Sequence, residues 1–77
     1  MKSIYKPQYL QLGLKISYYR KLRGLTQEEL AEKVDCTPAF IGHVEAPNID
    51  KAISMDMLFS ISNALDIPAY KLLKFDD

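Results

Sequence analysis

The sequence predicts a single all-α domain built from five short helices. Apolar residues recur at spacings of three and four, and no segment alternates apolar and polar residues as a half-buried strand does. Hydroxyl side chains stand where helices would begin, and glycine or aspartate stands where they would end. The 77 residues suffice for one core. We expect residues 1–8 to form an N-terminal arm and residues 9–77 to form the domain.

The first helix is expected over about residues 9–23. Leu12, Ile16 and Tyr19 fall on one face at helical spacing, which predicts a side that packs on the core. Gly24 follows directly, and glycine is the residue that most readily ends a helix in a left-handed conformation. The first element is therefore predicted as a long helix with a glycine stop.

The second helix is expected over residues 27–34. Thr26 precedes it, and Glu29 lies three residues later, which is the spacing of a capping box. Asp35 follows the last apolar residue of the helix. Aspartate tolerates a left-handed backbone better than most residues, so a tight turn is predicted at this position.

The third helix is expected over residues 38–45. Thr37 supplies a hydroxyl cap, and Pro38 occupies the first helical position, where its missing N–H costs nothing. By spacing, Ile41 and Val44 point toward the core. The residues left on the outward face are Ala39, Phe40, Gly42 and His43.

The remaining chain is expected to form a loop and two helices. Residues 46–53 are predicted as the loop, and Ser54 is the predicted cap of the fourth helix. Pro68 is expected to open a short fifth helix. The apolar residues predicted to line the inner side of the fourth helix are Met55, Leu58, Ile61 and Leu65.

The pair of helices between Leu25 and Glu45 resembles the helix-turn-helix of the phage-repressor and Cro-type family of bacterial DNA-binding proteins, also called the XRE family. The resemblance extends over residues 12–73. It implies a lambda-repressor-like fold in which the third helix lies in the major groove of double-stranded DNA. The motif residues are Leu12-Gly13, Ile16, Arg20, Gly24-Leu25-Thr26-Gln27-Glu28-Glu29-Leu30-Ala31, Ile41, Val44-Glu45 and Ala64-Leu65.

The resemblance also implies which residues would read bases. The residues that match the family's base-reading positions include no arginine, lysine, glutamine or asparagine, which are the side chains that make bidentate base contacts. DNA shape is therefore expected to supply part of the specificity. Two members have a plainer interpretation, because Phe40 could pack against the turn and His43 could be an ordinary surface residue. The expected base-contacting residues are Thr37, Pro38, Ala39, Phe40 and His43.

Phosphate contacts are expected from Gln27, Lys15 and Lys51. Gln27 matches the family position that donates to a phosphate at the start of the second helix. Family members often have a glycine and a basic residue after the motif glutamate, whereas this chain has residues Ala46-Pro47-Asn48, so Lys51 is expected to substitute. The family pairing of an arginine in the first helix with the glutamate that ends the third implies an ion pair between Arg20 and Glu45.

The charge distribution agrees with this expectation. Residues 1–25 contain six basic and no acidic residues, whereas residues 26–77 contain four basic and ten acidic residues, although the net charge is zero. The basic segment is the one expected to approach the phosphate backbone. Neutral charge and an apolar reading face also leave an alternative, a protein–protein interaction module that keeps the fold without binding DNA.

The composition argues against several other functions. The single cysteine, Cys36, and the single histidine cannot form a zinc site or a disulfide, and no catalytic constellation is present, so we expect no enzyme, metal or cofactor. Without an apolar run or a signal peptide, the chain is expected to be cytoplasmic, with no membrane contact and no small-molecule ligand. A homodimer is expected through apolar residues of the C-terminal third, namely Met57, Phe59, Tyr70, Leu73 and Phe75.

Overall fold

The structure, a computed structural model, describes residues 4–49 and 51–75 and is all-α within them. The predicted fold class is therefore confirmed, although the fifth helix is a short 3₁₀ helix and not an α-helix. The first helix begins at Lys6, three residues earlier than predicted, so residues 6–8 of the expected arm are helical. The elements are α1 (Lys6–Leu22), α2 (Gln27–Lys33), α3 (Pro38–Glu45), α4 (Met55–Ala64) and η1 (Ala69–Leu72).

Three of the helices begin at the predicted hydroxyl caps. At α2 the capping box is complete, with the Glu29 N–H 3.0 Å from Thr26 Oγ1 and the Thr26 N–H 2.8 Å from Glu29 Oε1. Thr37 and Ser54 each accept from the backbone N–H three residues further on, at 3.1 Å. These bonds satisfy N–H groups that a helix start leaves without partners.

Three helix ends share one backbone motif. Gly24, Asp35 and Asp66 follow α1, α2 and α4 with φ values of 73°, 58° and 57°. After each one the next N–H donates to a carbonyl five residues back, as Cys36 N–H does to Ala31 O at 3.0 Å. The left-handed turn at Asp35 sets the direction in which the chain enters α3.

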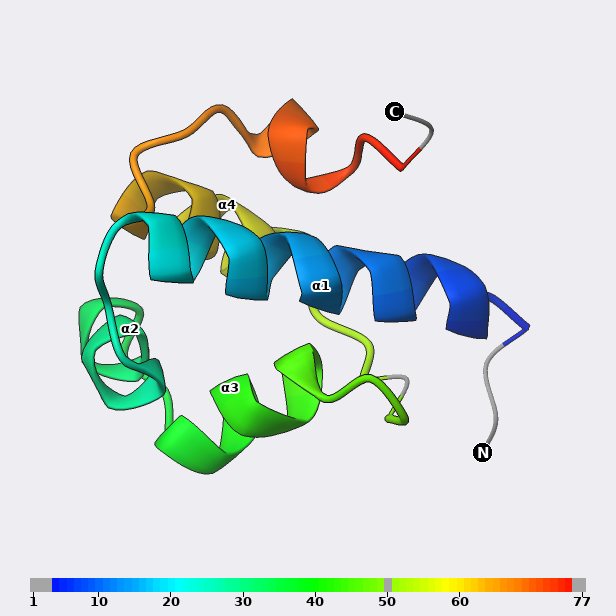
Figure 1. Cartoon of the computed structure of the whole chain (residues 1–77), viewed down its shortest axis with the longest axis horizontal. Coiled ribbons are helices and arrows are strands. Elements are labelled where there is room, and N and C mark those ends of the chain that lie inside the picture. Colours follow the sequence, from blue (N-terminus) through cyan, green and yellow to red (C-terminus); the bar gives the residue numbers. More distant parts are fainter. Residues whose placement is uncertain (1–3, 50, 76–77) are drawn as a thin grey trace.

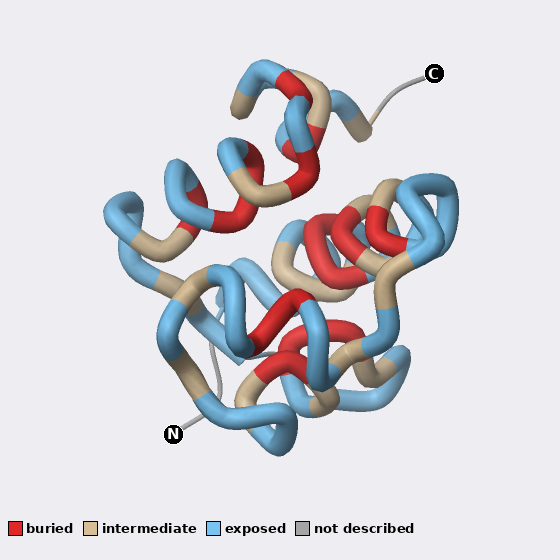
Figure 2. Tube along the Cα trace, turned by 90° about the vertical axis from the view of Figure 1, so that its left-hand side faces the viewer, coloured by how far each residue is buried: buried red, intermediate tan, exposed pale blue. Residues whose placement is uncertain are grey.

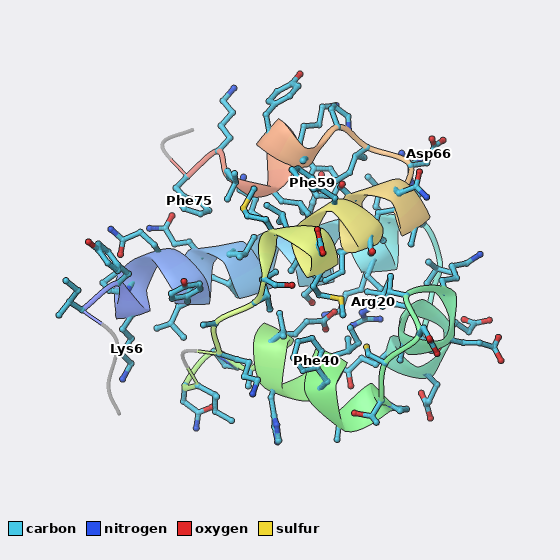
Figure 3. All side chains as sticks on the ribbon, turned by 180° about the vertical axis from the view of Figure 1, so that it is seen from behind. Lys6, Arg20, Phe40, Phe59, Asp66 and Phe75 are labelled. Carbon is cyan, nitrogen blue, oxygen red and sulfur yellow. The ribbon has the colours of Figure 1, made fainter. Side chains whose placement is uncertain are left out.

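The helices enclose one core. In Figure 1, α1 crosses the front of the molecule, α2 and α3 lie along one edge, and η1 lies along the opposite edge. Seen from behind in Figure 3, α4 is in front, and the buried stretches in Figure 2 turn toward the middle. Every element contributes to this core, whose fully buried side chains are Ile16, Leu30, Ile41, Ile61, Leu65 and Leu72.

One predicted core residue lies outside it. Met55 is 57% exposed, whereas Leu58, Ile61 and Leu65 are buried as predicted. Met55 is the first residue of α4, where the helix has not yet reached the core. The apolar stripe of α4 therefore begins one turn later than the spacing predicts.

The backbones of α1 and α3 approach each other closely at Gly13. Gly13 is buried, and a methyl group added to it would overlap the main-chain carbonyl of Val44. Because the obstacle is backbone, no side-chain rearrangement could relieve the overlap. Gly13 thus allows α3 to pack directly on α1.

Within the described residues, no helix combines the length and apolar character that crossing a bilayer requires.

Candidate nucleic-acid interface

The third helix has two sharply different sides. Its inner side chains, Ile41 and Val44, are 0% and 2% exposed. On its outer side, Ala39 and His43 are exposed, and the cap residue Thr37 is exposed with them. The outward surface of α3 therefore consists of small or neutral groups, together with the exposed ring of Pro38.

Phe40 faces outward only in part. Its side chain is half-buried and packs against the core cluster, which agrees with the plainer interpretation of this residue. Lys51 Nζ lies 5.6 Å from the centre of the Phe40 ring, a cation–π distance. The contact connects the loop after α3 to α3 itself and holds a cation beside this helix.

A buried ion pair holds the end of α3 against α1. Arg20 Nε and Nη2 donate to Glu45 Oε2 and Oε1 at 2.7 and 2.9 Å, in a bidentate arrangement. Arg20 Nη1 also donates to the Leu25 carbonyl at 2.6 Å. The structure thus brings together the two residues expected to pair, and joins α1, the α1–α2 turn and α3 through one guanidinium group.

Gln27 joins the same network. Its Nε2 donates to Glu45 Oε1 at 3.0 Å, and a Cβ on Gly42 would lie 3.5 Å from Gln27 Oε1. The side chain of Gln27 thus runs from the start of α2 to α3. Sequence reasoning placed Gln27 at a phosphate but missed this bond, because the partner lies 18 residues away.

The predicted cations are not all near α3. Lys15 lines a groove with Tyr18, Tyr19 and Phe75. By helical geometry this side of α1 is roughly opposite to Gly13, where α3 packs. The excess of basic residues in this segment could not locate Lys15 on a particular side of the helix, and its phosphate contact remains a prediction.

Two other basic residues have roles that the sequence did not reveal. Arg23 Nε donates to the Leu65 carbonyl at 2.7 Å, and its Nη2 donates to the Asp66 carbonyl at 3.2 Å, so Arg23 caps the end of α4. Lys6 extends from the start of α1 toward the edge of the molecule that carries α3 (Figure 3). Lys51 lies beside α3 through its contact with Phe40.

Cys36 has no reactive setting. It is half-buried in the turn before α3, and its Sγ lies 3.6 Å from the Thr37 carbonyl oxygen. Burial, together with the nearby Asp35 carboxylate, raises the pKa of the thiol, which disfavours the nucleophilic thiolate. Cys36 therefore acts as a small packing residue.

Two capped helices meet at a tight turn, and the second presents one exposed face while a buried ion pair holds its other end. This arrangement defines a helix-turn-helix protein of the DNA-binding class. Residues 16–72 match the family model described as "Helix-turn-helix". The chain belongs to this family, in agreement with the resemblance to phage-repressor and Cro-type proteins.

Relatives with known roles have the same fold. The HTH-type transcriptional regulator SinR of Bacillus licheniformis is 32% identical over 66 residues, which cover 86% of this chain and 59% of SinR. The restriction-modification controller protein C.AhdI of Aeromonas hydrophila is 26% identical, with a TM-score of 0.79 over 86% of this chain and 97% of C.AhdI. A structure of SinR, the master regulator for biofilm formation, in complex with DNA is 32% identical, with a TM-score of 0.75 over 82% of this chain and 98% of that one.

Proposed function

We propose that this chain is a transcriptional regulator that binds specific sites in double-stranded DNA through the outward face of α3. The observation that carries the proposal is the structure of that helix, which exposes one face and is fixed on the other by a buried ion pair. A helix held in this way fits into a major groove. The related SinR, which was crystallised in complex with DNA, supports the same function.

Base contacts are assigned to the exposed residues of α3. Thr37 Oγ1 accepts the Phe40 N–H, and its own hydroxyl proton remains able to donate to a base. Ala39 suits contact with a thymine methyl group, and His43 suits donation to guanine. Pro38 and the exposed edge of Phe40 complete a surface that follows groove shape more than it makes bidentate contacts.

Phosphate contacts are assigned to Gln27, Lys51 and Lys6. The Gln27 amide uses one N–H on Glu45, which leaves its second N–H to donate to a phosphate oxygen. The Phe40 ring holds Lys51 beside α3, in place of the basic residue expected after Glu45. These contacts would fix the position of α3 along the groove without reading sequence.

The protein is proposed to act as a homodimer. Of the five residues expected at the dimer surface, Phe59, Tyr70 and Leu73 are 52%, 64% and 48% exposed, whereas Met57 and Phe75 pack partly against the core. Met55 adds to the exposed apolar surface of α4. A symmetric pair joined there would present two α3 helices to half-sites about 34 Å apart.

The rival function is a protein-interaction module without DNA binding. The absence of bidentate side chains on the outward face of α3 favours it. The two functions differ in one property, since a DNA-binding protein retains weak, salt-sensitive affinity for any duplex.

The test is selection of bound genomic fragments, followed by fluorescence anisotropy on the recovered duplex. We expect one sequence to be enriched and the logarithm of affinity to fall linearly with the logarithm of salt concentration. An Ala39→Glu variant, which places a carboxylate on the outward face of α3, should lose binding while it keeps its unfolding temperature. If wild type shows no duplex binding at low salt, the proposed function is wrong.

The dimer is tested separately by sedimentation on duplexes that carry one or two half-sites. Two copies on the double site are expected, with weaker binding to the single site.

A further inference from the structure

The outer face of α1 carries an apolar stripe that the DNA-binding function does not use. Leu14, Tyr18 and Leu22 follow one another at intervals of four residues and are 56%, 59% and 60% exposed. They lie opposite Leu12 and Ile16, which are 6% and 0% exposed and form the inner face. The helix is thus apolar on two opposite faces, and the core covers one of them.

A helix with apolar residues on both faces is typical of a helix that is buried on both sides. Large side chains grouped on one exposed face mark a site of protein interaction. We propose that the outer face of α1 is a docking surface for an amphipathic helix of another protein, with large apolar residues on its inner side and acidic residues beside them.

The charges around the stripe indicate the chemistry of that partner. The sequence of α1 contains no acidic residue, and Lys15 and Lys21 lie on either side of the stripe by helical geometry. A partner with aspartate or glutamate beside its apolar residues would match this surface. A second copy of the chain would not, because α1 contains no acidic residue and would bring only basic side chains to the two flanks of the stripe.

The surface also has a shape that suits a helix. Beside the stripe lies a groove of about 450 Å³, large enough for an anchoring side chain of a docked helix. The Tyr18 ring meets the Tyr19 ring edge to face, with centroids 4.9 Å apart and an interplanar angle of 81°. This contact holds Tyr18 in place before binding, which lowers the entropy cost of docking. The groove is lined by Gln11, Leu14, Lys15, Tyr18, Tyr19 and Phe75.

Docking at this surface leaves the other two surfaces accessible. The views in Figures 1 and 3 place α1 on one broad face of the molecule and α4 on the opposite face, with α3 along an edge. The proposed dimer surface of α4 and η1 and the outward face of α3 therefore point elsewhere. The inference does not depend on the proposed DNA-binding function.

The experiment uses a display library of 20-residue amphipathic helices in which the residues beside the apolar positions are randomised. The full chain selects binders, and anisotropy with the synthesised peptides measures affinity. We expect enrichment of acidic residues. The double variant Leu14→Ser, Leu22→Ser should bind the selected peptides at least about tenfold more weakly, and Tyr18→Ser should weaken binding without loss of the helical circular dichroism signal.

The matched control is Met55→Ser, which removes an equally exposed apolar residue from α4. It should bind the peptides as wild type does, and all variants should keep the DNA affinity of wild type. The inference is overturned if no peptides are enriched, if the enriched ones are basic, or if the double variant binds them normally. It is also overturned if that variant turns a dimeric wild type into a monomer, because the second copy would then be the occupant.

Discussion

The two faces of α3 differ in what determines their residues. The inner face is set by the protein itself, because Ile41 and Val44 fill the core and Glu45 bonds to both Arg20 and Gln27. The outward face is exposed, so its small residues are accessible to a ligand. Substitutions on the inner face should therefore act on stability, and substitutions on the outward face should act on DNA affinity.

The largest effect is expected at the buried ion pair. Glu45→Ala should lower the free energy of unfolding by roughly 3–5 kcal/mol, because it leaves the buried Arg20 guanidinium without its counter-charge. Denaturant unfolding of Glu45→Ala, Arg20→Ala and the double variant measures the coupling. Additive losses in that cycle would show that the pair does not position α3.

A second loss of stability is expected where the inner face meets α1. Gly13→Ala should cost roughly 1–3 kcal/mol or more, because the added methyl group displaces the Val44 main chain. The displaced helix should also bind DNA less well. Ser17→Ala, a half-buried position on the same helix, is the control, and an unfolding midpoint for Gly13→Ala equal to that of this control would refute the close contact.

The helix starts and the turn before α3 were largely predictable from sequence, because they depend on residues close together in the chain. The caps at Thr26, Thr37 and Ser54 and the turn at Asp35 depend on neighbours within about five residues, and their chemistry can be read directly. The Arg20–Glu45 pair came from the family resemblance and not from spacing. Gly13 could be identified as a family motif residue, but its contact with Val44 could not.

Side chains that meet distant parts of the chain could not be placed from sequence. Arg23 was counted among cations that approach DNA, yet it caps α4 from 42 residues away. Lys15, which was expected at a phosphate, lines a groove together with Phe75, and its phosphate contact remains a prediction. The net charge of a segment does not say where each side chain points. Only the packing of the helices distinguishes the positions of Arg23 and Lys15 from that of Lys6, which extends toward the edge that carries α3 (Figure 3).

On the outward face, His43→Ala should leave stability within about 0.5 kcal/mol of wild type. Its cost should appear in binding, at about 1–3 kcal/mol, and preference at one base pair of each half-site should relax. Anisotropy with duplexes substituted one base pair at a time measures this. Unchanged base preference in the variant would exclude His43 from reading the sequence.

The smallest effect is expected at Gln27, which bonds to Glu45 on the inner side of α3 and is also proposed to contact a DNA phosphate. Gln27→Ala should lower stability by about 1 kcal/mol through loss of its bond to Glu45. It should also weaken binding to all duplexes by a similar factor, with an unchanged salt slope because glutamine is neutral. Lys51→Ala is the contrasting variant, since it should reduce that slope by about one. A loss confined to one base pair would contradict the phosphate role.

The central claim, that the outward face of α3 contacts DNA, is tested most directly by amide chemical-shift mapping of the ¹⁵N-labelled chain with a selected duplex. We expect the largest shifts at Ala39, Phe40 and His43 and at the start of α2 around Gln27. Amides along the outer face of α1 should move little. Shifts concentrated on α1 or α4, with α3 unaffected, would contradict the account.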